Sequence, residues 1–202
     1  LLAFTMVLTM VPTVALAGDV TYSGDAVTGA DQISAGDAYV IAALYEGTYY
    51  GLTNDAGTVS NALNAVALDV QEGRVISAPD TAVWVPAAGV DGGFTLADLS
   101  GQQITYAGSG TTLRLSNAGT ELAFSDANGG ITANFGGTTR YLTFRMNNSV
   151  PQFRGYAEQN LSASGYNGYL TVFSVSEDSS GGDVTVATPA AEPAGGAGEA
   201  GT

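Results

Sequence analysis

The stretch Gly-Asp-Ala-Tyr-Val-Ile-Ala-Ala, residues 36–43, sets a pattern that the chain repeats twice. Residues 92–97 read Gly-Gly-Phe-Thr-Leu-Ala, and residues 129–135 read Gly-Gly-Ile-Thr-Ala-Asn-Phe. In each case a turn signal precedes a short apolar run, which is typical of a β-strand. A pattern that recurs along a chain is a stronger fold signal than the propensity of any one segment. The sequence from residue 39 to residue 175 therefore predicts three related β units.

Each opening stretch is followed by a second candidate strand and later by a closing aromatic residue. The second strands are residues 50–52, 103–106 and 141–144, and the closing aromatics are Trp84, Phe124 and Phe173. The strand spacing gives about four strands per unit. We therefore expect an all-β, β-trefoil-like domain of three four-stranded repeats, with a β-sandwich as the alternative. All three closing aromatics are expected to be buried in equivalent positions.

Several of these segments resemble a known group of protein modules. They are Arg140-Tyr141-Leu142, then residues 152–156 (Gln-Phe-Arg-Gly-Tyr) and residues 169–173 (Tyr-Leu-Thr-Val-Phe). They are similar to the C-terminal part of β-trefoil-like accessory modules in large secreted proteins of Gram-positive bacteria. In such proteins the module accompanies hydrolases. Ricin-type lectins are distant relatives by fold, but Ala82 precedes Trp84 where their Gln-x-Trp signature has glutamine, so no lectin site residue is carried over.

The two ends of the chain differ in composition from its centre. Residues 1–17 are mostly apolar and end in Ala-Leu-Ala, which is typical of a signal peptide that lacks its basic start. The alternative is a membrane span, for which this segment is short and contains Pro12. Residues 18–36 form a lead-in, residues 37–176 the predicted domain, and residues 177–202 an acidic Ala/Gly/Pro-rich linker expected to be disordered. The organisation predicts a secreted or cell-surface protein that is a piece of a larger chain, with no membrane partner once the signal is cleaved. The resemblance implies that the protein is bacterial.

Composition excludes several classes of function. The chain has no cysteine and no histidine, and its five basic residues are all arginine, against 19 acidic residues and a net charge of −14. An acidic surface repels phosphate backbones, so nucleic acid is not an expected partner. Disulfides, Ser-His-Asp triads, cysteine nucleophiles and lysine Schiff bases are impossible. We expect no catalytic residues and no cofactor.

Two oxygen-rich turns invite comparison with calcium sites. They are residues 54–57 (Asn-Asp-Ala-Gly) and residues 126–129 (Asp-Ala-Asn-Gly). Neither has the alternating acidic spacing of a calcium loop. Asn, Asp and Gly suit tight turns without any metal, so no metal site is predicted.

The strongest candidate for ligand binding is a concentration of arginine and aromatic residues in the third unit. Strand alternation predicts that Arg145 and Arg154 point away from Phe144 and Phe153, and so outward. Tyrosine rings stack on sugars, and guanidinium groups donate to hydroxyls and carboxylates. The predicted ligand-binding residues are Arg145, Arg154, Tyr156 and Tyr166. The other interpretation is that these tyrosines pack in the core.

Two functional hypotheses follow. The first is a non-catalytic secreted module that binds a glycan or cell-wall polymer for a neighbouring domain. The second is a structural spacer or protein-interaction domain of a surface protein. Exposure of the tyrosine cluster favours the first hypothesis, and its burial favours the second.

Overall fold

A computed structural model describes residues 20–56, 61–90, 92–125 and 130–178. The chain is all-β with antiparallel pairing, as the sequence predicted, and three short 3-10 turns are the only helical elements of the described residues. The predicted signal peptide lies outside the described residues, and so does the predicted linker apart from its first two residues. No helix in the described part is long and apolar enough to cross a membrane.

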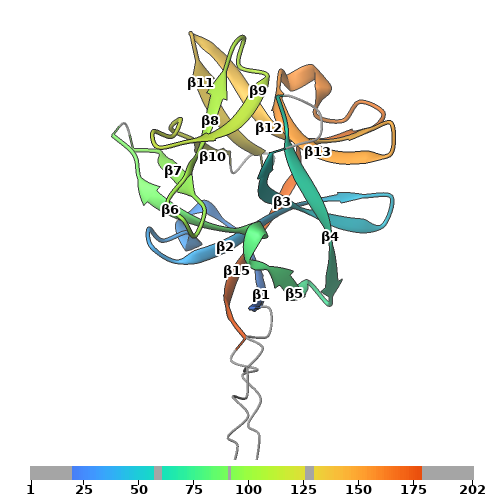
Figure 1. Cartoon of the computed structure of the whole chain (residues 1–202). Coiled ribbons are helices and arrows are strands. Elements are labelled where there is room, and N and C mark those ends of the chain that lie inside the picture. The colour runs from blue at the N-terminus through green and yellow to red at the C-terminus, as the bar shows by residue number, and fades with distance from the viewer. Residues whose placement is uncertain (1–19, 57–60, 91, 126–129, 179–202) are drawn as a thin grey trace, which may run out of the picture.

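Six strands form a closed antiparallel barrel at one end of the molecule (Figure 1). The ring runs β1, β15, β2, β3, β4, β5 and back to β1. Their bounds are β1 Thr21–Val27, β15 Leu170–Glu177, β2 Ala38–Tyr45, β3 Thr48–Ala56, β4 Leu63–Gln71 and β5 Arg74–Pro79. Closure leaves these strands without free edges along most of their length.

The remaining strands form a second path that starts and ends on this barrel. β6 leaves β2 beside Tyr39, and β13 returns to β4 beside Leu63. Between them, Phe94 of β7 forms an isolated bridge with Leu122, the residue before β10, and the two exchange backbone hydrogen bonds. The strands are β6 Val83–Ala88, β7 Phe94–Ala97, β8 Gln103–Ala107, β9 Thr112–Ser116, β10 Ala123–Ser125, β11 Gly130–Phe135, β12 Thr138–Asn147, β13 Val150–Tyr156 and β14 Tyr166–Asn167. The 3-10 turns are η1 Ala30–Gln32, η2 Asp80–Ala82 and η3 Glu158–Asn160.

Strand β2 is buried on both faces, which explains why its sequence is a continuous apolar run. Tyr39 and Ile41 pack into the larger of two hydrophobic clusters, and Val40 and Ala42 pack into the smaller one. A half-buried strand alternates instead, as β9 does with Leu113 buried and Arg114 exposed. β2 is thus the central wall between the two parts of the core.

The lead-in predicted for residues 18–36 contains part of the barrel. β1 lies within it and pairs with β15 on one side and β5 on the other. A backbone hydrogen bond of 2.8 Å from Asp178 to Thr21 completes this seam. The folded region therefore starts before residue 37, and its last strand ends at Glu177.

The closing aromatics do not share one environment. Trp84 and Phe173 are buried, as predicted, and the indole nitrogen of Trp84 donates to the Leu52 carbonyl at 2.9 Å. The prediction for Phe124 was wrong: its ring is half-buried, and Leu122, two positions earlier, takes the buried place. Two apolar residues at this spacing on one strand share a face, and the sequence alone did not show which one lies deeper.

Candidate functional site

The four predicted ligand-binding residues form one side-chain cluster on β12, β13 and β14. Arg145 on β12 lies opposite Tyr166 on β14 and opposite Gln152 on β13. Arg154 and Tyr156 follow Gln152 at alternate positions of β13. Residues directly opposite or two apart share one face of a sheet, so these side chains all project to the same side.

Contacts within this tyrosine–arginine cluster hold the side chains in place. A guanidinium nitrogen of Arg145 donates to the Tyr156 hydroxyl at 3.3 Å, and its carbon lies 5.2 Å from the centre of the Tyr166 ring. Arg154 lies 5.8 Å from the centre of the Tyr156 ring. The two tyrosine rings meet edge to face, with centroids 4.9 Å apart at 88°. Each arginine is thus packed on an aromatic face, an arrangement favourable to a cation.

The cluster is half-buried, between the two outcomes that the sequence left open. Arg145, Arg154, Tyr156 and Tyr166 all have intermediate exposure, whereas Phe144 and Phe153 beside the arginines are fully buried. The prediction that the arginines point away from the core is confirmed. The hydrogen bond to Tyr156 raises the pKa of Arg145, so its guanidinium stays charged at any physiological pH.

Arg154 also has a structural role that the sequence did not reveal. Its Nε donates to the Thr111 carbonyl at 3.2 Å, in the turn between β8 and β9. Close packing of this hairpin on β13 depends on Gly155, where a Cβ would overlap the Gly110 carbonyl oxygen. This arrangement leaves the two terminal nitrogens of Arg154 free of hydrogen bonds to the described residues.

Two further residues belong to this face and were absent from the predicted site. Tyr141 lies directly opposite Tyr156 on β12 and has intermediate exposure. Gln152 is 1% exposed, and neither its amide nitrogen nor its amide oxygen has a partner among the described residues. A buried amide without a partner is costly. Only the pairing register of β12 and β13 could have shown that Gln152 lies opposite Arg145.

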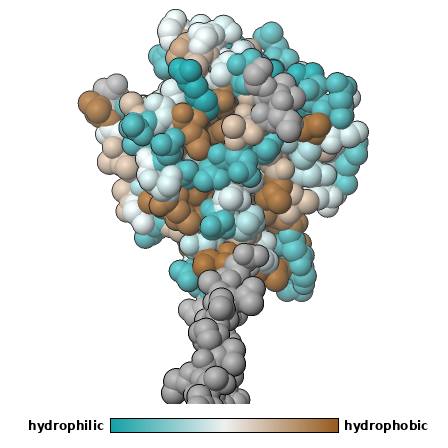
Figure 2. All heavy atoms as spheres, viewed as in Figure 1, coloured by the Kyte–Doolittle hydropathy of each residue, from teal (hydrophilic) through white to brown (hydrophobic). Residues whose placement is uncertain are grey.

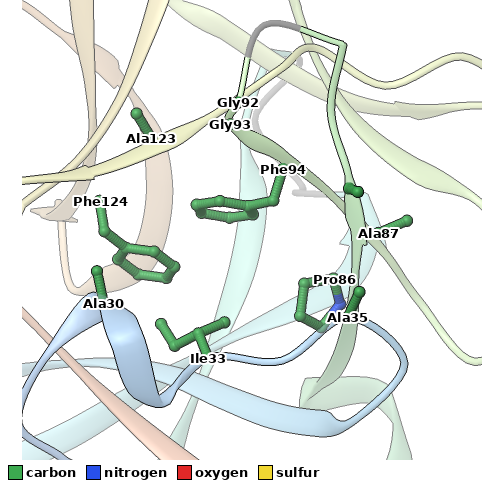
Figure 3. Close-up of a pocket in the computed structure, with 11 residues that line it drawn as sticks. Ala30, Ile33, Ala35, Pro86, Ala87, Gly92, Gly93, Phe94, Ala123 and Phe124 are labelled. Carbon is green, nitrogen blue, oxygen red and sulfur yellow. The ribbon is translucent and has the colours of Figure 1, made fainter.

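A second concave feature is an apolar pocket of about 350 Å³ between η1, β6, β7 and β10 (Figure 3). Phe94 and Phe124 stack beside it with centroids 4.5 Å apart at 17°, and Ile33 and Pro86 face them. Its side chains are uncharged. The backbone around it is largely hydrogen-bonded, since Pro86 accepts from Gly36 and Gly93 accepts from Gly89. The side chains of the pocket are apolar, and its polar groups belong to the backbone.

Two more cavities have mixed walls. One of about 390 Å³ adjoins the apolar pocket through Gly93 and Ala123 and includes Glu121. The other, of about 360 Å³, lies between β4 and β9 and includes Arg114. The four predicted ligand-binding residues line none of these three cavities. The tyrosine–arginine cluster is thus half-exposed and lies outside these three cavities.

The structure brings together no metal-binding group within its described ranges. Of the two turns compared with calcium loops, residues 54–56 belong to β3, and residues 126–129 lie outside the described residues. Asn54 donates to Asp98 at 3.0 Å, so its side chain takes part in a structural hydrogen bond.

No protein-family model matches the chain, and no curated protein matches it. The geometry of the chain's own residues therefore carries the functional argument.

Proposed function

We propose that this chain is a non-catalytic binding module that docks a glycan or cell-wall polymer through the tyrosine–arginine cluster. The observation that carries this proposal is that Arg145, Arg154, Tyr156 and Tyr166 lie in one half-exposed cluster. Aromatic faces and fixed N–H donors together match the apolar faces and hydroxyl groups of a sugar. Contacts among the four side chains lower the entropy lost when a ligand binds.

The proposal also includes the location of the protein and the finer class of its fold. In this proposal the module is secreted or surface-attached, because residues 1–17 have the composition of a signal peptide. We also propose that the whole domain, the barrel together with β6 to β14, is a β-trefoil of three repeats. In support, each strand that carries a closing aromatic pairs with an opening strand: β6 with β7, β10 with β11, and β15 with β2. An experimental structure that fails to superpose on itself after a threefold rotation would overturn the repeats.

The test of binding compares two double variants on immobilised polysaccharides and purified cell walls. Arg145→Ala/Tyr166→Ala removes half of the cluster, and Arg114→Ala/Tyr22→Ala removes the same residue types from β9 and β1. We expect wild type and the control pair to be retained and the cluster pair to elute freely, with thermal melting confirming that all three are folded. Equal retention of both pairs would place binding elsewhere on the molecule. If wild type is retained on none of the polymers, the glycan proposal is wrong.

A protein-interaction domain is the second candidate, and the apolar pocket favours it. Its uncharged walls and stacked phenyl rings suit an apolar side chain of a partner better than a sugar, whose hydroxyls need polar groups. Hydrophobic residues on the face in Figure 2 form separate patches divided by hydrophilic ones, so this candidate rests on the pocket alone. Loss of partner capture in Phe124→Ser, with glycan retention unchanged, would support it.

A further inference from the structure

We propose that the ligand of the tyrosine–arginine cluster is an acidic sugar, recognised through a single carboxylate that binds Arg145 and Arg154. This inference rests on the proposed glycan-binding function and names the class of glycan. It follows from the charges in and around the cluster, from the hydrogen-bond donors that remain open, and from the net charge of the whole chain.

The first step concerns charge pairing. The chain has 19 acidic residues and five arginines, but within the described residues only Arg74 forms an ion pair, 3.0 Å from Asp25. Arg114 and Arg140 form none within that part of the chain, and neither do the two arginines of the cluster. Arg145 and Arg154 make no ion pair with any acid of the described residues, although both are half-buried. A half-buried positive charge is favoured by an opposite charge beside it, and a bound carboxylate supplies one.

The second step concerns donor geometry. A guanidinium has five N–H donors in a planar fork. Within the described residues, Arg145 uses one terminal nitrogen on Tyr156, and Arg154 uses its Nε on Thr111. Both terminal nitrogens of Arg154 are open, and so are Nε and the second terminal nitrogen of Arg145. Each guanidinium thus keeps an adjacent pair of donors, which is what bidentate binding of a carboxylate requires.

The third step concerns the rest of the sugar. Both guanidinium groups lie over tyrosine rings, which limits their motion before the ligand arrives. Tyr141 lies opposite Tyr156 on the same face and makes no ring contact with another aromatic of the described residues. Its half-exposed ring is the one available for stacking on a pyranose while the arginines hold the carboxylate.

The net charge of −14 limits how acidic the ligand can be. Repulsion between the protein and a dense polyanion acts over a Debye length of about 8 Å at physiological ionic strength. A carboxylate in contact with two arginines is attracted at short range, whereas further charges on the same polymer are repelled. The inferred ligand is therefore a polymer or oligosaccharide with widely spaced uronic-acid-type residues, and sulfated or phosphate-rich polymers are rejected.

The test uses the full chain and a matched pair of probes. One probe is a tetrasaccharide of alternating glucose and glucuronic acid, and the other is the same tetrasaccharide after reduction of its carboxyl groups to alcohols. Calorimetric titration of wild type should show the acidic probe binding at least about tenfold more tightly, because charge-assisted hydrogen bonds are roughly twice as strong as neutral ones. Equal affinity for the two probes would overturn the acidic-sugar inference and leave glycan binding intact.

Variants separate local recognition from general electrostatics. Arg145→Gln and Arg114→Gln each lower the net charge by one unit, but only the first lies in the cluster. We expect Arg145→Gln to lose most of the preference for the acidic probe, with Arg154 left as its one partner, and Arg114→Gln to keep the wild-type preference. An equal loss of preference in both variants would show that the site assignment is wrong. Failure of wild type to bind either probe or any polysaccharide of the retention assay would overturn the proposed function itself.

Discussion

At the scale of single residues, Trp84 and Phe124 show how the same sequence signal leads to different burial. Trp84 has no exposed surface, and its indole N–H is bonded to the Leu52 carbonyl. Phe124 stacks on Phe94 at the edge of the apolar pocket and keeps part of its surface open. Position in a repeat therefore predicted that an aromatic residue belongs near the core, and packing decided how deeply.

This difference predicts unequal stability losses. Trp84→Ala should lower the free energy of unfolding by about 3–5 kcal/mol, as large aromatic truncations in cores do. Phe124→Ala should cost roughly half as much or less, because less apolar area leaves water when its ring packs. Urea unfolding measures both. A loss for Phe124→Ala equal to that of Trp84→Ala would contradict the half-buried position of its ring.

For Gln152 we predict that a substitution does not lower the free energy of unfolding and can raise it. Its amide is buried without a partner among the described residues, and a buried unpaired polar group costs about 1–3 kcal/mol. Gln152→Met keeps the length of the side chain and removes the amide, so the free energy of unfolding should stay equal or rise by about 1 kcal/mol. Gln152→Glu is the control and should destabilise strongly, because it buries a charge. A clear loss of stability in the methionine variant would show that the amide is bonded after all.

At the scale of elements, the three opening strands were predictable, whereas β1 and the pairing partners of the strands were not. The three opening strands are present as β2, β7 and β11 because apolar runs after glycine turns act locally. β1 was missed because Thr21–Val27 has only one large aliphatic residue, and it becomes a strand through pairing with β5 and β15. The candidate site shows the same difference between local signals, which the sequence contains, and tertiary pairing, which it does not show. Alternation placed the arginines outward, but the β12–β13 register that adds Tyr141 and Gln152 is a tertiary property.

The turn between β7 and β8 is organised by one carboxylate, and its stability should depend on pH. Asp98 is 4% exposed and accepts hydrogen bonds from Ser100, Asn54 and Gln102 at 2.7–3.0 Å. Burial alone raises the pKa of Asp98, but these hydrogen bonds outweigh it and hold its pKa below the ordinary aspartate value of 3.8. The ionised form is thus favoured by folding. Its stabilising contribution is present above that value and is lost as pH falls through the lower pKa of the folded state.

Asp98→Asn isolates this contribution. At pH 7 the variant should be less stable by about 1–3 kcal/mol, since a neutral amide accepts fewer and weaker bonds than the carboxylate. The gap between the two proteins should narrow as the pH falls below about 4. Denaturant titrations at pH 7, 5 and 3 measure it, with Asp31→Asn on the exposed η1 turn as the matched control. A gap that stays constant over this range would contradict the role of the ionised carboxylate.

At the scale of the whole molecule, barrel closure depends on β1. Without it, β5 and β15 would expose unpaired edges, and Val75 and Phe173 in the smaller hydrophobic cluster would lose cover. A chain that begins at Asp37 should therefore lose cooperative thermal unfolding or aggregate. A chain that begins at Gly18 should unfold in one sharp transition with the same midpoint as the full chain. If the chain that begins at Asp37 melts with an unchanged midpoint, β1 is dispensable and the barrel is not the folding unit.

The pairing of β1 with β15 also determines how far the domain can separate its neighbours. Thr21 and Asp178 are bonded to each other, so the polypeptide enters and leaves the fold at one point. A domain whose two ends lie together adds almost no distance between the segments on either side of it, which makes it a poor spacer. Tension on the two ends would also separate β1 from β15 one hydrogen bond at a time, from the outer end inward, as a zipper opens. Strands β12 and β13 lie at the end of the molecule opposite β1, away from the point where the described chain begins and ends (Figure 1).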